Sequence, residues 1–233
     1  MVKTGLQPDD VTVQAGDRRL HADLVIPEGA EAIVAFAHGS GSSRFSPRNR
    51  AVARTLNGGG LATLLLDLLS LEEQRADEVT GHLRFDIGLL ADRVAGAIDW
   101  LGREERTRGL RIGLFGASTG AAAALVAAAK RPDVVFAVVS RGGRPDLAAE
   151  SLPAVKAPVL LIVGGYDSAV IEMNRDAARQ LRCENQLEIV PGAGHLFEEA
   201  GKLEEVARLA RDWFVAHLQA KQARVAGTMS DER

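Results

Sequence analysis

LRIGLFGASTGAAAALVAAA, residues 110–129, carries more structural information than any other stretch of this chain. The apolar run at residues 110–115 predicts a buried strand, and the alanine-rich run after Gly120 has high helix propensity and no charge. Between them, Gly116-Ala117-Ser118-Thr119-Gly120 predicts a sharp strand-to-helix turn, in which the central serine takes a strained backbone conformation. The two glycines leave room for the close approach that such a turn needs. The stretch therefore presents Ser118 where a nucleophile would be exposed.

Two later segments supply residues that would activate a serine nucleophile. Asp167 follows the apolar run at residues 159–163, and His195 follows the run at residues 187–190. A serine hydroxyl becomes nucleophilic when a general base takes its proton, and the base needs an acid that fixes its tautomer and stabilises its cation. Both residues stand on loops after predicted strands, so the chain offers nucleophile, acid and base in the order Ser, Asp, His.

With these motifs the sequence resembles the α/β-hydrolase superfamily over roughly residues 10–218, and within it the small, lidless dienelactone-hydrolase-like branch. The resemblance implies an α/β fold: a mostly parallel central sheet that begins with an antiparallel hairpin, helices on both faces and no lid domain. It also implies that Ser118, Asp167 and His195 form a catalytic triad. Dienelactone hydrolases proper use a cysteine nucleophile, and the serine here favours ordinary ester or thioester substrates over a dienelactone.

A second motif, His38-Gly39-Ser40-Gly41, follows another apolar run. A serine hydrolase needs two backbone N–H groups directed at the oxygen that becomes negative when the carbonyl is attacked. The residue after the nucleophile, Thr119, supplies one, and the resemblance places the other at Ser40. Gly39 and Gly41 allow the backbone to turn inward and are candidate substrate contacts. The resemblance implies that His38 supports this loop by hydrogen bonding and is not the base.

Arginines near the predicted catalytic end are candidate ligands for an anionic substrate. Arg141 and Arg144 follow the strand predicted over residues 134–139, and Arg44 lies just after the second motif, from where it would reach across the cleft. The alternative interpretation is that these arginines are solvated or structural. We predict Arg44 and Arg141 as candidate substrate-binding residues.

The remaining segments are less distinctive. The charged segment at residues 69–84 predicts an irregular segment that either shapes one wall of the site, since it leaves the carboxyl end of a central strand, or is a solvated mobile loop. Apolar spacing predicts helices over residues 47–57, 174–182 and 203–218. The polar residues 220–233 predict a disordered C-terminal tail beyond a single domain at residues 1–219.

Composition narrows the classes of partner. A formal net charge of -3 argues against a basic surface for nucleic acid, so we expect a small-molecule ester substrate. The single cysteine, Cys183, excludes an intramolecular disulfide and a cysteine-based metal cluster. The polar start of the chain and the absence of a long apolar run predict a cytoplasmic protein without membrane partners. A triad hydrolase requires no cofactor and no metal, and the sequence leaves the oligomeric state open, a homodimer included.

The sequence thus predicts a carboxylic-ester hydrolase with Ser118 as nucleophile. The alternative is a non-catalytic binding or scaffold module of the same fold, linked to another enzyme. An assembled triad would favour the first, because a serine without an oriented base has little reactivity.

Overall fold

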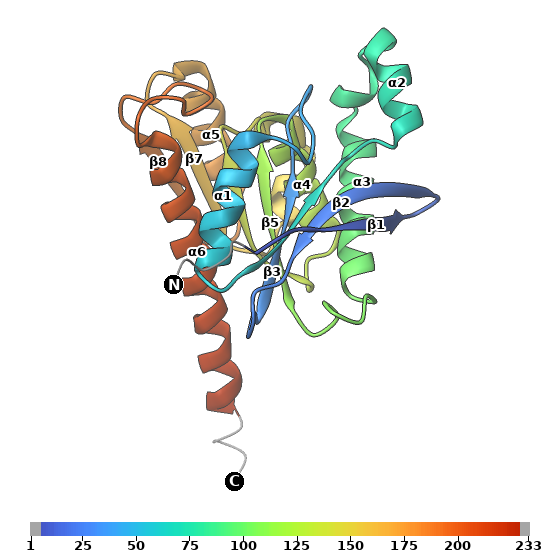
Figure 1. Cartoon of the computed structure of the whole chain (residues 1–233). Helices are drawn as coiled ribbons and strands as arrows, with labels where there is room; N and C mark the ends of the chain where they lie inside the picture. The colour runs from blue at the N-terminus through green and yellow to red at the C-terminus, as the bar shows by residue number, and fades with distance from the viewer. Residues whose placement is uncertain (1–5, 229–233) are drawn as a thin grey trace.

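The computed structural model describes residues 6–228 and contains an eight-stranded sheet (Figure 1). The strands, in the spatial order β1-β2-β4-β3-β5-β6-β7-β8, are β1 Asp9–Ala15, β2 Arg18–Val25, β4 Ala62–Leu66, β3 Ala32–Ala37, β5 Arg111–Ala117, β6 Val135–Arg141, β7 Val159–Gly164 and β8 Asn185–Val190. β1 and β2 form an antiparallel hairpin, β2 is antiparallel to β4, and every pairing from β4 to β8 is parallel. The predicted α/β-hydrolase fold is confirmed, including the hairpin.

Helices cover both faces of the sheet. The helices are α1 Pro47–Gly58, α2 Leu71–Thr80, α3 Ile87–Leu101, α4 Thr119–Lys130, α5 Ser168–Gln180 and α6 Lys202–Thr228, with 3-10 segments η1 Leu83–Phe85 and η2 Pro145–Ala154. α1 and α6 pack on one face, and α3, α4 and η2 on the other. The central strands β3, β4 and β7 bury every residue, as parallel strands between two helical layers do.

The segment at residues 69–84 is mainly helical, so the prediction of a loop was wrong. Ser70 Oγ accepts a hydrogen bond from the Glu73 N–H, and the Glu73 carboxylate accepts one from the Ser70 N–H. This reciprocal pair begins α2, which lies apart from the two helical layers (Figure 1). The motif Ser-x-x-Glu is visible in the sequence and indicates a helix start, whereas the high charge of the segment favoured a loop.

Two helix boundaries also differ from the predictions. α5 begins at Ser168, directly after Asp167, whereas a helix was predicted only from residue 174. α6 continues to Thr228, so residues 220–228 are helical where a disordered tail was predicted, and residues 229–233 lie outside the described part of the chain. Within residues 6–228, no helix combines the length and apolar character needed to cross a membrane.

Candidate active site

Ser118 stands at the turn from β5 into α4 with φ 51° and ψ -122°, a positive-φ conformation that L-residues rarely adopt. The flanking glycines make this turn sterically possible. A Cβ on Gly116 would lie 2.3 Å from Ala121 Cα, and one on Gly120 would lie 2.3 Å from the Ala37 carbonyl oxygen. The Ser118 N–H donates to the carbonyl oxygen of Arg141 on β6 at 3.2 Å. The predicted strand-turn-helix geometry is therefore present, with its central serine strained.

Asp167 and His195 form a hydrogen-bonded pair at the same edge of the sheet. Asp167 follows β7 and His195 follows β8, and His195 Nδ1 donates to Asp167 Oδ2 at 2.6 Å. Asp167 is the N-cap residue of α5, yet its carboxylate makes no capping bond and is left for the histidine. Because carboxyl ends of parallel strands meet at one edge, these residues and Ser118 come from three strands to one region. Because His195 uses Nδ1 in this hydrogen bond, its other ring nitrogen, Nε2, is not engaged by Asp167.

Ser118 and His195 share the wall of a cavity of about 250 Å³. The loop after β3 contributes Gly39 and Ser40, and a Cβ on Gly39 would lie 3.1 Å from the Cβ of Ser118. Gly39 therefore allows the loop to approach the serine closely. The second predicted glycine contact, Gly41, has φ +70° and lines a neighbouring cavity of about 240 Å³, bounded on its far side by α2.

The two predicted oxyanion donors are not equivalent. Thr119 occupies the first position of α4, where a backbone N–H has no partner four residues earlier in the helix. The Ser40 N–H, by contrast, donates to the Thr119 side-chain Oγ1 at 2.8 Å. Thr119 therefore supplies one predicted donor, its own backbone N–H, while its hydroxyl accepts a hydrogen bond from the other predicted donor, the Ser40 N–H. The sequence did not reveal this second interaction.

His38 holds the loop after β3 to the loop after β4. Its Nε2 accepts from the Leu68 N–H at 3.2 Å, so the proton is on Nδ1, which donates to the Gly39 carbonyl oxygen at 2.9 Å. Burial lowers the pKa of His38 and outweighs the Gly39 hydrogen bond and the charge of Asp67, which act in the opposite direction. These contacts agree with a supporting role for this histidine, away from the base position.

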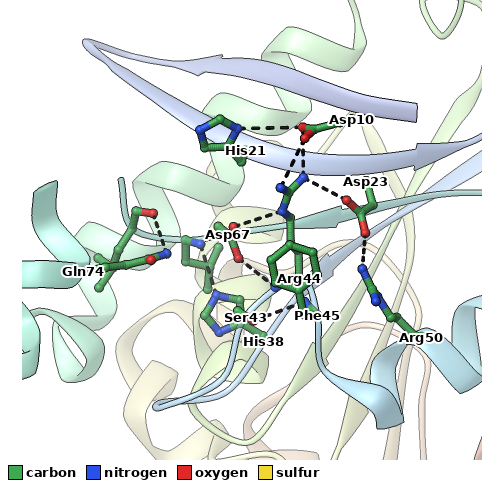
Figure 2. A network of polar contacts seen from close by, with 12 residues as sticks. Asp10, His21, Asp23, His38, Ser43, Arg44, Phe45, Arg50, Asp67 and Gln74 are labelled. Carbon is green, nitrogen blue, oxygen red and sulfur yellow. Dashed lines mark hydrogen bonds and ion pairs between the residues drawn. The ribbon is translucent and has the colours of Figure 1, made fainter. Parts of the chain in front are cut away.

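Arg44 lies in a carboxylate network and outside the cavity of Ser118 (Figure 2). Its guanidinium contacts Asp10 at 3.0 Å, Asp23 at 2.8 Å and Asp67 at 3.4 Å, and its backbone N–H donates to Asp67. Arg50 reaches the other oxygen of Asp23 at 2.8 Å. The guanidinium is thus occupied in joining the loop to β1, β2 and the end of β4. We therefore withdraw Arg44 as a candidate substrate ligand.

Arg141 does line the cavity, at the end of β6 beside the nucleophile. Arg144 does not; it is paired with Asp146 at 2.7 Å on the surface. Two further polar residues of the cavity wall, Arg48 and Asn49, come from the first turn of α1 and were missed from the sequence. Asn49 is 3% exposed and lies on the same helical face as Val52, so a polar residue at an apolar-face position was the available signal.

The part of the chain that the structure describes holds no cluster of three or more His, Cys, Asp or Glu side chains arranged for a metal ion. The second cavity, between the loop after β3 and α2, has a mixed wall that includes Leu68, Leu69 and Gln74. Its position agrees with the prediction that residues 69–84 shape one side of the site, although they do so as a helix.

Comparison with known proteins places the chain among α/β hydrolases. The model of the dienelactone hydrolase family matches residues 21–221. A solved dienelactone hydrolase from Anabaena variabilis is 61% identical, with a TM-score of 0.90 over 91% of this chain and 98% of that one. Est1E from Butyrivibrio proteoclasticus is 17% identical with a TM-score of 0.76, over 90% of this chain and 99% of its own, a likeness of fold alone.

One relative, found in two strains, has a name that does not describe a hydrolase. A Mycobacterium tuberculosis protein provisionally named a phosphoribosyl transferase is 54% identical over 213 residues, which are 91% of this chain and 47% of the relative. The same protein from a second strain of that organism matches equally. The chain thus spans about half the length of these relatives.

Proposed function

Because the chain belongs to the dienelactone hydrolase family and is thus a hydrolase of the α/β fold, we propose that it cleaves small ester or thioester substrates through an acyl-enzyme on Ser118. The observation that carries the proposal is the 2.6 Å hydrogen bond from His195 Nδ1 to Asp167, made beside a cavity that His195 shares with the strained Ser118. An imidazole oriented in this way presents Nε2 as a base to the serine hydroxyl.

In the proposed mechanism, His195 Nε2 takes the proton of Ser118 Oγ as Oγ attacks the substrate carbonyl carbon. The oxygen that becomes negative accepts hydrogen bonds at the Ser40 and Thr119 side of the cavity, while Asp167 stabilises the imidazolium. His195 then gives the proton to the departing alcohol or thiol, and the bond to the leaving group breaks. Water, deprotonated by His195, attacks the acyl-enzyme and releases the acid.

The serine in the nucleophile position is the reason to propose ordinary esters. A serine hydroxyl needs a general base at each turnover, and the Asp167–His195 pair supplies one. The transferase name of the Mycobacterium tuberculosis relatives does not transfer to this chain in our proposal: we assign it to the half of those proteins that lies outside the match.

Hydrolysis of p-nitrophenyl esters from acetate to decanoate tests the proposal. Wild-type protein should turn over at least one short-chain ester, and Ser118→Ala should lower kcat by about 1,000-fold or more, as the loss of a triad nucleophile does. Ser151→Ala is a matched control, because Ser151 lies in η2 and does not line the cavity. Equal, feeble rates for wild type and Ser118→Ala would contradict the assignment.

The second candidate function, a non-catalytic module linked to another enzyme, is favoured by one observation: the curated relatives are about twice as long as the matched segment. Labelling with a fluorophosphonate distinguishes the two. An assembled triad reacts stoichiometrically at Ser118, and the label disappears in Ser118→Ala. A folded protein that reacts no faster than free serine would support the non-catalytic module.

A further inference from the structure

Arg141 is a buried cation without an anionic partner. The residue is 6% exposed, and its Nη2 donates to the neutral side-chain oxygen of Asn49 at 3.2 Å, while its Nε has no hydrogen-bond partner. Among the residues that the structure describes, no carboxylate forms an ion pair with it. Burying a charge that lacks an opposite charge is costly, so such a group needs a reason to be retained.

Arg141 also lies next to the reacting groups. Its carbonyl oxygen accepts from the Ser118 N–H, and its side chain lines the cavity that contains Ser118 and His195. Burial and the nearby Arg48 cation lower the pKa of Arg141 to about 10, so the guanidinium remains charged at neutral pH. The cavity therefore holds a positive charge within reach of a substrate bound at Ser118.

Arg48 adds a second cation from the first turn of α1. Its Nη1 contacts Glu198 at 3.0 Å, and its Nε is buried without a partner. The first turn of α1 contains no acidic residue, so the positive end of the helix dipole faces the same cavity with only the neutral Ser46 hydroxyl as its cap. With Glu198 paired to Arg48, the two arginines of the cavity wall carry one positive charge that no directly paired carboxylate balances.

The contrast with Arg44 shows that the chain can neutralise a buried arginine. Arg44 is held by three carboxylates, from β1, β2 and the end of β4 (Figure 2). Among the described residues, Arg141 has no such partner. We propose that Arg141, assisted by Arg48, binds a carboxylate on the substrate, so that the preferred substrates are esters that carry a negative charge. An excess of one positive charge matches a monoanionic carboxylate better than a dianionic phosphate, and a guanidinium offers a carboxylate two parallel N–H donors. This inference rests on the proposed hydrolase function of the same cavity.

A pair of esters that differ mainly in charge tests the inference. The mono-p-nitrophenyl ester of glutarate carries a terminal carboxylate, and p-nitrophenyl valerate is its neutral counterpart. Wild-type kcat/KM should be about 10-fold or more higher for the glutarate ester. Arg141→Met should lower kcat/KM for the glutarate ester by about 10- to 100-fold and for the valerate ester by less than about threefold, because a charge-assisted hydrogen bond is lost in the first case only.

Two further variants separate binding from folding. Arg144→Gln removes a surface arginine of the same loop that does not line the cavity, and it should leave the ratio of the two kcat/KM values unchanged. Arg48→Met should reduce the ratio in the same direction as Arg141→Met, and it lies on a different element should the β6 variant fail to fold. Equal losses on both esters in Arg141→Met and Arg48→Met would overturn the inference and leave the arginines structural.

A binding measurement distinguishes failure of this inference from failure of the hydrolase proposal. Calorimetric titration of wild-type protein with glutarate should show saturable binding that Arg141→Met weakens by about 10-fold or more. Binding without hydrolysis of either ester would refute the hydrolase function but keep the anion site. Hydrolysis of valerate with glutarate binding unaffected by Arg141→Met would refute only the anion site. Tighter binding of inorganic phosphate than of glutarate would overturn the assignment to a carboxylate.

Discussion

The backbone N–H of Ser40 donates a hydrogen bond to the side-chain Oγ1 of Thr119 across 2.8 Å. Thr119 is 5% exposed and directly follows Ser118, the proposed nucleophile, so its hydroxyl links the two backbone donors of the proposed oxyanion site. The hydroxyl can accept from Ser40 and donate its own proton to a bound oxygen. We therefore infer that the Thr119 side chain contributes to the proposed oxyanion site in addition to its backbone N–H.

We predict that Thr119→Val lowers kcat for p-nitrophenyl esters by about 10- to 100-fold with little change in KM, because the valine methyl can neither accept from Ser40 nor donate to an oxyanion. Thr119→Ser keeps the hydroxyl and should retain activity within about threefold. A Thr119→Val enzyme as active as wild type would mean that the hydroxyl is dispensable and that the Ser40 N–H serves the substrate directly.

Gly142 lies close to His195, where a side chain would press on the histidine. It has φ +52°, and a Cβ at this position would lie 3.1 Å from the His195 carbonyl oxygen and 3.5 Å from Cε1 of its ring. Gly142→Ala should lower kcat by about 10-fold, because displacing a catalytic base by a fraction of an ångström is costly. Steady-state kinetics beside thermal unfolding measure the two effects separately.

Gly29→Ala is the matched control for Gly142→Ala. Gly29 has φ +73°, but a Cβ on this residue would meet no atom within 4 Å, so the substitution carries the same backbone penalty of about 1 kcal/mol without the contact to the base. It should lower the unfolding temperature and leave kcat within about twofold. A similar loss of kcat in both variants would show that backbone strain alone explains the effect.

Arg44 should matter for stability. Arg44→Met leaves the Asp67 carboxylate, whose side chain is 9% exposed, without a cation and leaves Asp23, 11% exposed, with Arg50 alone, and we expect the free energy of unfolding to fall by about 3 kcal/mol. Urea unfolding followed by circular dichroism measures the change. Arg106→Gln removes an exposed arginine that contacts Asp9 and Glu104, and it should cost less than about 1 kcal/mol. Equal losses would show that burial of the carboxylates is unimportant.

The lowered pKa of His38 leads us to predict that the stability of the protein depends on pH. Its pKa is lowered in the folded protein, chiefly by burial, relative to the ordinary value of 6.5. Between the two pKa values the unfolded chain binds a proton that the folded chain does not, so the contribution of His38 is complete above about pH 6.5 and is lost as the pH falls below it. Urea unfolding at pH 7.5 and pH 5.5 should show a larger loss on acidification in wild type than in His38→Gln. Identical losses would place the pH sensitivity elsewhere.

Local sequence was sufficient to predict the sharp turn at Ser118 and the positions of Asp167 and His195 after strands. The spacing of Gly116 and Gly120 around Ser118 reflects a steric requirement between residues close in sequence, and the structure shows the clash that any side chain there would meet. Asp167 and His195 were identified because each follows an apolar strand, and carboxyl ends of parallel strands converge wherever the helices pack. The α/β fold followed from the same runs of buried strand residues.

Sequence reasoning failed at one local signal and at one long-range contact. Residues 69–84 were misjudged because a capping box, Ser70 with Glu73, outweighs the high charge of the segment. Arg48 and Asn49 escaped notice because their significance lies in facing Arg141, which is more than ninety positions away in the chain and on another element.

The sequence alone sufficed for the strand-turn-helix geometry at Ser118, the placement of Asp167 and His195 after strands, and the α/β class, since each depends on steric and hydrophobic patterns between residues close in sequence. Only the tertiary structure showed that Arg44 is paired with carboxylates and Arg141 is not. Both arginines lie at or beyond the carboxyl end of a strand, and local sequence does not distinguish them. Arg44 meets three carboxylates from β1, β2 and the end of β4, whereas Arg141 meets none among the described residues. Whether a buried charge is neutralised depends on which distant segments packing brings beside it.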